Sequence, residues 1–406
     1  MSTYEMSPPH GAGAKLTHPV ELVGFALIVV NVVAAIAFCV QGSWIVPVAN
    51  GNVADFVTFW AAGREILAGH AAAVYDWPTL KPIEEAIVGP FRGYLGWAYP
   101  PPYLFVAAAL ALLPYAAACV FWIFSTFWAY LAAIRSIVGD RVGYFLAAAF
   151  PAVLANFMVG QNAFLSASLL GGALALMEER PLCAGALLGL LSYKPHLGLL
   201  IPIALLAGGR WRTIAAAAGV VAVMAAASVL VFGDETWRAF FAGISPALTF
   251  DGAAWGKLKS AFGLTRALGG GETLAWTVHV IVALIAAGAV GVLWRSGVAY
   301  EIKAAGLGTA VLLATPHLLA YDMVILAVPI AFLFRLGRAC GFLKHELAGI
   351  GVACLLVLIY PLLEAPVGFA AALVIATLVL RRATTADKAE ATVEAASGGR
   401  NVQPLT

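Results

Sequence analysis

The 406-residue chain is 62% hydrophobic and 11% charged, with a mean hydropathy of +0.93. A water-soluble globule of this length cannot bury so many apolar side chains, so the composition indicates an integral membrane protein. The formal net charge of +2 gives no basic field, which argues against a nucleic-acid partner. The five cysteines are scattered through apolar runs and predict neither a disulfide framework nor a cysteine metal site.

Apolar runs recur from residue 19 to residue 382. Runs of about 17 to 25 residues are long enough to cross a hydrocarbon core. Isolated strands would leave backbone groups unsatisfied in lipid, so we expect an all-α polytopic membrane protein. It should have about twelve transmembrane helices, with a range of roughly ten to thirteen. We predict a re-entrant or interfacial helix at 102–114 and a broken pair of helices at 181–192 and 195–208.

Lysines and arginines beside spanning helices favour the cytoplasmic side. Their positions predict a multi-pass protein of the cytoplasmic membrane with both termini inside and with two long extracytoplasmic loops, 42–100 and 233–271. The chain then divides into an N-terminal segment, 1–18, a transmembrane domain, 19–382, and a tail, 383–406, that is low in large apolar residues and predicted to be disordered. The cytoplasmic side is marked by Lys15, Arg135, Arg141, Arg180, Arg210, Arg212, Arg295, Lys303, Arg335, Arg338, Lys344, Arg381 and Arg382.

The first outer loop contains an amphipathic pattern that begins at an acid, Asp55. The pattern predicts a helix along the outer membrane surface, with Thr58, Arg64 and Glu65 turned away. Asp55 has two compatible interpretations: an N-cap that accepts a backbone N–H, or a general base for a sugar hydroxyl. Capping would favour the ionised form and so lower the basicity of the carboxylate. The apolar positions are Phe56, Phe59, Trp60, Gly63, Ile66 and Leu67.

Aromatic residues are frequent in the rest of this loop. They suit an interfacial aromatic belt, and they also suit a surface on which a carbohydrate stacks. The sequence leaves both interpretations open for Tyr75, Trp77, Trp97, Tyr99 and Tyr103. In the second long loop, the stretch "DGAAWGKLKSAFGLTRALGG" predicts either a solvated loop or a flap that binds the acceptor.

The motif "SYKPHLG" places Lys194 and His196 on either side of Pro195, at a break between two apolar runs. Proline suits the first turn of a helix, whose N–H groups would then point outward toward an anion, with Lys194 adding a full charge. A lysine at a helix end can instead extend its charged head to the membrane surface. An ionisable residue within a membrane region favours the functional interpretation, a site for a phosphate group.

Two further motifs carry polar side chains at predicted outer turns. "TPHLLAYD" contains His317, Tyr321 and Asp322, and the first two lie one helical turn apart if the backbone is helical. "NFMVGQNAF" contains Gln161, a neutral amide of the kind that orients a sugar. A histidine at a membrane edge can also be simply hydrogen-bonded, and Gly160 beside Asn162 is an ordinary turn signal.

Four stretches in this order resemble the pattern of glycosyltransferase family 87, a group of polytopic C-type glycosyltransferases. They are "DFVTFWAAGREILAGHAAAVYD", "YPPPYLFVAAALALLPYA", "GQNAFLSASLLGGALALMEERPLCAGALLGLLSYKPHLGLLIPIALLAGGRWR" and "ATPHLLAYDMVILAVP", within residues 50–335. The resemblance implies a C-type fold whose long first extracytoplasmic loop carries the catalytic acid, here Asp55. It also implies a lipid-linked sugar donor and no nucleotide-sugar site. Many C-type enzymes show a double acid, whereas Ala54 and Phe56 flank Asp55, which makes a metal site less expected.

The expected activity is therefore that of an inverting hexosyltransferase with no cofactor. It would move a hexose, mannose by family resemblance, from a polyprenyl phosphate to a hydroxyl of a glycolipid or cell-envelope glycan. Asp55 would be the base. Lys194, His317 and His196 would bind the donor phosphate, and the sugar or acceptor would contact Gln161, Asp322, Tyr321, Tyr99 and Trp97.

A multi-pass transporter or lipid flippase is the rival interpretation, because it would share the broken helices and the charges within the membrane. The enzyme interpretation requires Asp55, Lys194 and His317 to converge on one site. No motif that we identify specifies the acceptor, the linkage, the prenyl chain length or the oligomeric state.

Overall fold

The protein is a bundle of helices, as predicted: every regular element among the described residues is an α-helix or a short 3-10 helix. The computed structural model describes residues 24–33, 55–91, 95–247, 257–359 and 366–398. The predicted N-terminal segment, the start of the first outer loop and the "DGAAW" part of the second lie outside these ranges.

The α-helices are Gly24–Val33, α2 (Phe56–Leu67), α3 (Trp77–Val88), α4 (Leu104–Ala111), α5 (Tyr115–Val138), α6 (Val142–Ala149), α7 (Ala152–Val159), α8 (Ala163–Leu176), α9 (Pro181–Leu190), α10 (Ile201–Ala207), α11 (Trp211–Phe232), α12 (Asp234–Ala247), α13 (Ala261–Ala267), α14 (Glu272–Arg295), α15 (Tyr300–Leu313), α16 (Ala327–Cys340), α17 (Glu346–Leu358) and α19 (Val367–Gly398). The 3-10 helices are η1 (Ala71–Tyr75), η2 (Pro101–Tyr103), η3 (Leu191–Tyr193), η4 (Pro195–Gly198) and η6 (Tyr321–Leu326).

Within the described ranges, five helical segments are long and apolar enough to cross a membrane, and a sixth is added if α6 and α7 count as one bent span. Other apolar helices have only 10 to 17 residues. The prediction of about twelve crossings is thus not confirmed and stays a prediction. The five segments are Tyr115–Val138, Trp211–Phe232, Glu272–Arg295, Tyr321–Cys340 and Val367–Thr385.

Prolines explain where the apolar runs break. Pro151 stands at the 66° bend between α6 and α7, Pro195 opens η4, and Pro316 follows α15. Proline lacks a backbone N–H and disfavours helical backbone in the residue before it, so a helix tends to end there. The predicted break between residues 192 and 195 is confirmed. These breaks leave polar backbone and side chains that must find partners within the protein.

Helix α2 buries its first two turns against protein, and its predicted position along the membrane surface stays a prediction. Phe56, Phe59 and also Thr58, which we expected to face away, are buried, whereas Leu67 is 48% exposed. Helices α3 and α4 pack against α2 and cover apolar surface that the amphipathic pattern would have offered to lipid. A helix that satisfies its apolar face within the bundle does not need lipid to cover it.

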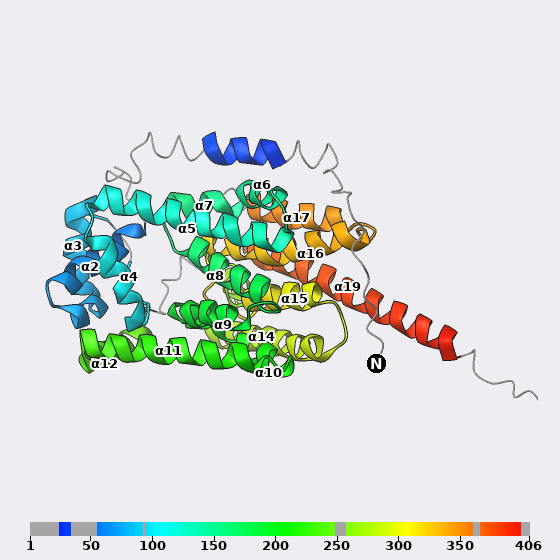
Figure 1. The fold of residues 1–406 in the computed structure, drawn as a ribbon. Helices are drawn as coiled ribbons and strands as arrows, with labels where there is room; N and C mark the ends of the chain where they lie inside the picture. The colour runs from blue at the N-terminus through cyan, green and yellow to red at the C-terminus, as the bar shows by residue number, and fades with distance from the viewer. Residues whose placement is uncertain (1–23, 34–54, 92–94, 248–256, 360–365, 399–406) are drawn as a thin grey trace, which may run out of the picture.

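Close backbone contact holds α2 against α4. A Cβ atom at Gly63 would lie 2.1 Å from the carbonyl oxygen of Ala107. Helices α2, α3, α4 and α12 gather at one end of the bundle, and α19 projects from the other (Figure 1). Helix α12 reaches η1, where the rings of Tyr75 and Phe240 lie 5.7 Å apart. Segments of both predicted outer loops therefore meet at the same end.

The C-terminal tail differs from the prediction in part. We expected disorder from residue 383, but α19 continues to Gly398. The segment "TTADKAEATVEAA" is low in large apolar residues, yet Ala, Glu and Lys are strong helix formers. Low hydrophobicity therefore excluded a packed core here, although it did not exclude a helix.

Gly63→Ala should weaken the packing of α2 on α4, because the new methyl group would overlap the Ala107 carbonyl. We expect a loss of about 1–3 kcal/mol of stability, as for other overpacked contacts, measured by thermal unfolding in detergent micelles. Gly219→Ala in α11 is the control, since nothing lies within 4 Å of its Cβ position. Equal melting temperatures for the two variants would show that the close contact is unimportant.

Candidate functional site

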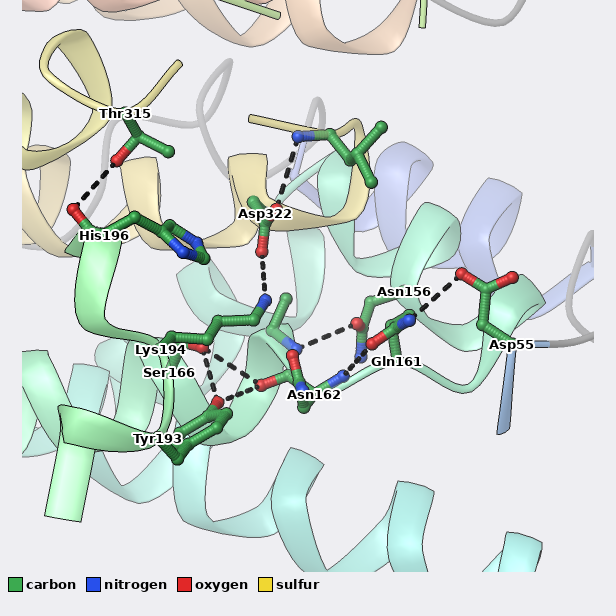
Figure 2. Close-up of polar contacts among 12 residues, drawn as sticks. Asp55, Asn156, Gln161, Asn162, Ser166, Tyr193, Lys194, His196, Thr315 and Asp322 are labelled. Carbon is green, nitrogen blue, oxygen red and sulfur yellow. Dashed lines mark hydrogen bonds and ion pairs between the residues drawn. The ribbon is translucent and has the colours of Figure 1, made fainter. Parts of the chain in front are cut away.

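The carboxylate of Asp55 points away from the helix that it precedes. Asp55 occupies the N-cap position of α2, but its side chain caps no backbone N–H; the first turn is closed by the Thr58 N–H, which donates to the Asp55 carbonyl at 3.2 Å. Instead, Asp55 Oδ2 accepts a hydrogen bond from Gln161 Nε2 at 3.1 Å (Figure 2). The capping interpretation is therefore wrong for the side chain, and the carboxylate is directed toward the polar cluster.

Burial raises the pKa of Asp55 from 3.8 to about 6. The hydrogen bond from Gln161 and the positive charges of Lys257 and Lys194 lower the pKa, but they do not cancel the effect of burial. An acid with a pKa of about 6 is ionised at neutral pH and is a far stronger base than an exposed aspartate. The environment of Asp55 thus raises the basicity of its carboxylate, whereas capping would have lowered it.

The turn between α7 and α8 brings Gln161 to Asp55. Gly160 ends α7 with φ +66°, and a Cβ there would lie 2.8 Å from the Cβ of Phe56, so the turn packs directly on α2. Gln161 Oε1 accepts from the Tyr99 hydroxyl and from the Asn162 N–H, both at 3.2 Å. Because these two donors hold the oxygen end of the amide, its NH₂ end faces Asp55.

Trp97 and Tyr99 belong to a packed aromatic cluster at this turn. Tyr103 stacks on Tyr193 at 4.5 Å, and Trp97 stacks on Tyr103 at 5.7 Å. Trp97 is 3% exposed, and its indole N–H donates to the Tyr99 carbonyl at 2.9 Å. Trp97 therefore supports Tyr99 from within the protein, whereas the Tyr99 hydroxyl reaches the polar cluster.

A buried ion pair forms the second half of the site. Lys194, between η3 and η4, donates to Asp322 Oδ1 at 2.7 Å across 128 residues of sequence, and both side chains are at most 4% exposed (Figure 2). The other carboxylate oxygen accepts from the Leu319 N–H at 3.3 Å, and the Lys194 ammonium lies 5.3 Å from the Tyr321 ring centre. Lys194 is thus anchored and does not extend toward the membrane surface.

One sequence-based expectation about this break needs correction. The backbone after Pro195 is a 3-10 turn of four residues, too short to present an anion-binding helix end. Asp322, for which the sequence predicts contact with a sugar hydroxyl or the orientation of a partner, pairs directly with Lys194, and its contact with the sugar or acceptor stays a prediction.

His317 lies in the non-helical link between α15 and η6, so it is not one helical turn from Tyr321 as we had considered. Its ring contacts Phe262 and Trp276, with centroids 6.1 and 6.2 Å away. Burial lowers the pKa of His317, and the nearby His279 lowers it further. The imidazole is therefore neutral at pH 7, and can donate one hydrogen bond but carries no charge.

His196 lies beside the ion pair. Its carbonyl accepts from the Thr315 hydroxyl at 3.5 Å, and its ring interacts electrostatically with Lys194, Asp322 and His317. These contacts connect the helix break after Tyr193 to the non-helical segment after α15. Since Lys194 also acts on the charge of Asp55, the structure brings the three predicted phosphate ligands and the predicted base into one electrostatic neighbourhood.

Two polar residues of this region escaped the sequence reading. Glu84 on α3 is completely buried and contacts the Thr58 hydroxyl at 2.8 Å. Asn162 is also completely buried, and among the described residues neither atom of its side-chain amide has a hydrogen-bond partner. Asn162 lies in the same turn motif as Gln161. The local sequence around Glu84 contains no signal that separates it from the other polar residues of α3.

These features define a helical membrane protein whose candidate site is built where helices begin or break. The sequence model of glycosyltransferase family 87 matches residues 97–316, more than half of the chain. The chain belongs to this family and is a membrane glycosyltransferase. Trp97, Gln161 and Lys194 fall within the match, whereas Asp55 and Asp322 lie outside it. Comparisons with curated proteins and with solved structures gave no match.

Removing one partner of the ion pair should destabilise the protein more than removing both partners. Lys194→Met and Asp322→Asn each leave a buried charge unpaired, with an expected loss of about 3–5 kcal/mol, and the double variant should lose less than the sum. Thermal unfolding in detergent micelles measures the coupling. The control cycle uses the more exposed Lys81 and Glu85, 3.7 Å apart, where the coupling should be about 0.5 kcal/mol or less. Additive losses at the buried pair would contradict the strength assigned to it.

Proposed function

We infer that this glycosyltransferase moves a hexose, with mannose the expected sugar, from a polyprenyl-phosphate donor to a hydroxyl of a lipid-linked or cell-envelope glycan. The reaction would take place on the outer face of the cytoplasmic membrane. The observation that carries the proposal is the Asp55 carboxylate, which is oriented by Gln161 and made basic by burial, in the same neighbourhood as the Lys194 ammonium.

In the proposed reaction, Asp55 accepts the proton of the acceptor hydroxyl as its oxygen attacks the anomeric carbon. The bond between that carbon and the donor phosphate oxygen breaks, and the leaving phosphate takes the electron pair. A single displacement inverts the anomeric configuration and forms no covalent enzyme intermediate. The proton resides on Asp55 at the end of the step and is released to solvent before the next turnover.

Lys194 would stabilise the charge that develops on the leaving phosphate. An ammonium has three N–H donors, and the contact with Asp322 uses one. Asp322 thereby holds Lys194 in place before the donor arrives, and a preorganised charge in a buried site stabilises a transition state more than a mobile one. The neutral His317 and His196 would donate hydrogen bonds to the same phosphate.

The sugar and acceptor hydroxyls would be oriented by neutral groups. Burial and the negative charge of Asp322 raise the pKa of Tyr99 well above its ordinary value, so its hydroxyl stays protonated. The side-chain amide of Asn162 is buried and without a partner among the described residues, and it could bind one hydroxyl through each of its atoms. Tyr321 would complete this side, its ring lying under Lys194.

Asp55→Asn should abolish most of the transfer, by about 100-fold or more, because asparagine cannot accept the acceptor proton. The wild-type rate should rise with pH and level off above the pKa of about 6, since the base is active when deprotonated. The measurement is transfer of labelled mannose from polyprenyl-phosphate-mannose to extracted envelope lipids by protein reconstituted in lipid. Other lipid-linked sugars serve as donors if mannose is not transferred.

Asp76→Asn is the matched control, because Asp76 precedes α3 as Asp55 precedes α2, but its exposed carboxylate accepts a hydrogen bond from an exposed threonine, Thr79. Loss of stability would not explain the Asp55 result. Folding raises the pKa of Asp55, so the folded protein loses stability as the pH rises from about 4 to about 6 and the buried carboxyl ionises. At pH 7.5 the Asp55→Asn variant lacks this unfavourable charge and should melt no earlier than wild type. Wild-type transfer by a folded Asp55→Asn variant would refute the base assignment.

A further inference from the structure

Part of the second predicted outer loop is buried against the non-helical link between α15 and η6. Residues 258–262 are at most 3% exposed. Leu258 and Phe262 form a small apolar cluster with Ala275 of α14, and Leu319 of the link packs on this cluster. The sequence predicts either a solvated loop or a flap that binds the acceptor here, and the burial of residues 258–262 excludes a solvated loop for this part.

Two hydrogen bonds join this segment to the link on either side of His317. The Lys259 N–H donates to the Leu318 carbonyl at 2.6 Å, and the Ser260 hydroxyl donates to the Pro316 carbonyl. Two consecutive residues thus bind the carbonyls immediately before and after His317. A buried carbonyl without a donor is costly, and the loop supplies donors at a place where the helix has ended.

The Ser260 hydroxyl makes a second contact that is compatible with the first. Its oxygen accepts from the Gly263 N–H at 3.1 Å and so caps the first turn of α13, while its single hydrogen is donated to Pro316. Ser260 is completely buried. The same side chain therefore begins α13 and holds the link.

The segment and the link are also fixed from other sides. A Cβ atom at Gly368, at the start of α19, would lie 2.8 Å from the Lys259 Cβ, so the backbone of α19 supports the segment from behind. His279 of α14 is 3% exposed, and its Nε2 lies 3.2 Å from the Ala314 carbonyl oxygen. A carbonyl can only accept, so the imidazole donates in this contact. The link is thus held at its start as well as around His317.

The His317 ring packs between this segment and α14. Its centroid lies 6.1 Å from that of Phe262, two residues after Ser260, and 6.2 Å from that of Trp276. The two carbonyl contacts fix the backbone at His317, and the two rings fix its side chain. A neutral imidazole would bind a phosphate through one directed hydrogen bond, which weakens steeply when the angle is poor. The phosphate contact proposed above therefore depends on the position of this ring.

We propose that Ser260 is a positioning residue: together with the Lys259 N–H, its hydroxyl holds the link around His317 and so directs the imidazole toward the donor phosphate. The second outer loop then belongs to the donor side of the site. Ser260 itself contacts neither substrate and acts through His317. The inference rests on the proposed function, which assigns His317 to the donor phosphate.

Ser260→Ala should raise the KM for the polyprenyl-phosphate-sugar donor about tenfold, because a displaced imidazole loses its directed hydrogen bond. The KM for the acceptor should change by less than about twofold, since the acceptor does not bind to His317. Ser260→Thr keeps a hydroxyl for both contacts and should restore most of the donor KM. Thr265→Val is the matched control, because the Thr265 hydroxyl donates to the Ala261 carbonyl within α13. It should keep the wild-type donor KM.

A double-mutant cycle separates positioning from a simple loss of stability. If Ser260 acts through His317, Ser260→Ala should have almost no further effect on the donor KM in a His317→Ala background. Loss of the α13 cap would instead act equally in both backgrounds, so additive effects would overturn the inference. If Ser260→Ala does not fold, Ser260→Gly takes its place, because glycine also lacks the hydroxyl but costs little at an N-cap.

Histidine-selective NMR in detergent micelles reports the position of the ring without using activity. The neighbouring rings of Phe262 and Trp276 shift the ring-proton signals of His317, which are assigned by their absence in His317→Ala. We expect these signals to move toward those of an exposed histidine in Ser260→Ala and to return in Ser260→Thr. Unchanged signals in Ser260→Ala would overturn the inference whatever the transfer rates are.

The combined results distinguish the inference from the proposed function. Moved ring signals with an unchanged donor KM in Ser260→Ala would overturn the positioning role alone. A wild-type donor KM in His317→Ala would refute the phosphate contact of the proposed function, and with it the purpose assigned to Ser260. The ring signals would then still report whether Ser260 holds the link.

Discussion

The burial of the Asp55 carboxylate is the constraint on which the rest of the site depends. An ionised group inside a protein costs free energy unless other groups replace its water. Here the replacement is partial: among the described residues, the carboxylate has one hydrogen bond, from Gln161, and the more distant charges of Lys257 and Lys194. A fully compensated carboxylate would be a poor base, and an uncompensated one would be protonated. The fold holds Asp55 between these limits, at a pKa of about 6.

Three acids of this region show how environment sets the role of a carboxyl group. Asp322 meets an ammonium directly and is committed to holding Lys194. Glu84 is completely buried and accepts a hydrogen bond from the Thr58 hydroxyl at 2.8 Å, and burial raises its pKa from 4.5 to about 7. Asp55 meets an amide and stays basic. The different roles follow from burial and from the partner of each group, because all three are carboxylic acids of nearly equal intrinsic acidity.

The architecture explains how such polar groups reach one place in an apolar protein. One helix begins at Asp55, another ends at Gly160, and a break between helices lies at Lys194. Polar side chains therefore lie at helix ends rather than on lipid-facing surfaces. Non-helical backbone at membrane depth is tolerated only where protein or a cavity covers it. The packed rings of Trp97, Tyr103 and Tyr193 provide that cover, and the family match runs through the same segments.

Sequence alone determined the helical membrane class, the breaks at proline and the family. These depend on composition, on local backbone chemistry and on motif order, all of which are properties of short stretches. It also identified Asp55, Gln161 and Lys194 as polar groups in an apolar chain. Their partners could not be read in the same way, because the Lys194–Asp322 contact spans 128 residues and the Asp55–Gln161 contact spans 106.

Only the tertiary structure decided which partner each carboxyl group meets. Periodicity predicts an apolar stripe on α2, and α3 and α4 pack against this helix, since an apolar stripe does not specify whether lipid or protein covers it. This packing buries Thr58 and brings Glu84 behind Asp55. The charge of each acid follows from burial and from the nearest donors, and both are set by packing between helices distant in sequence.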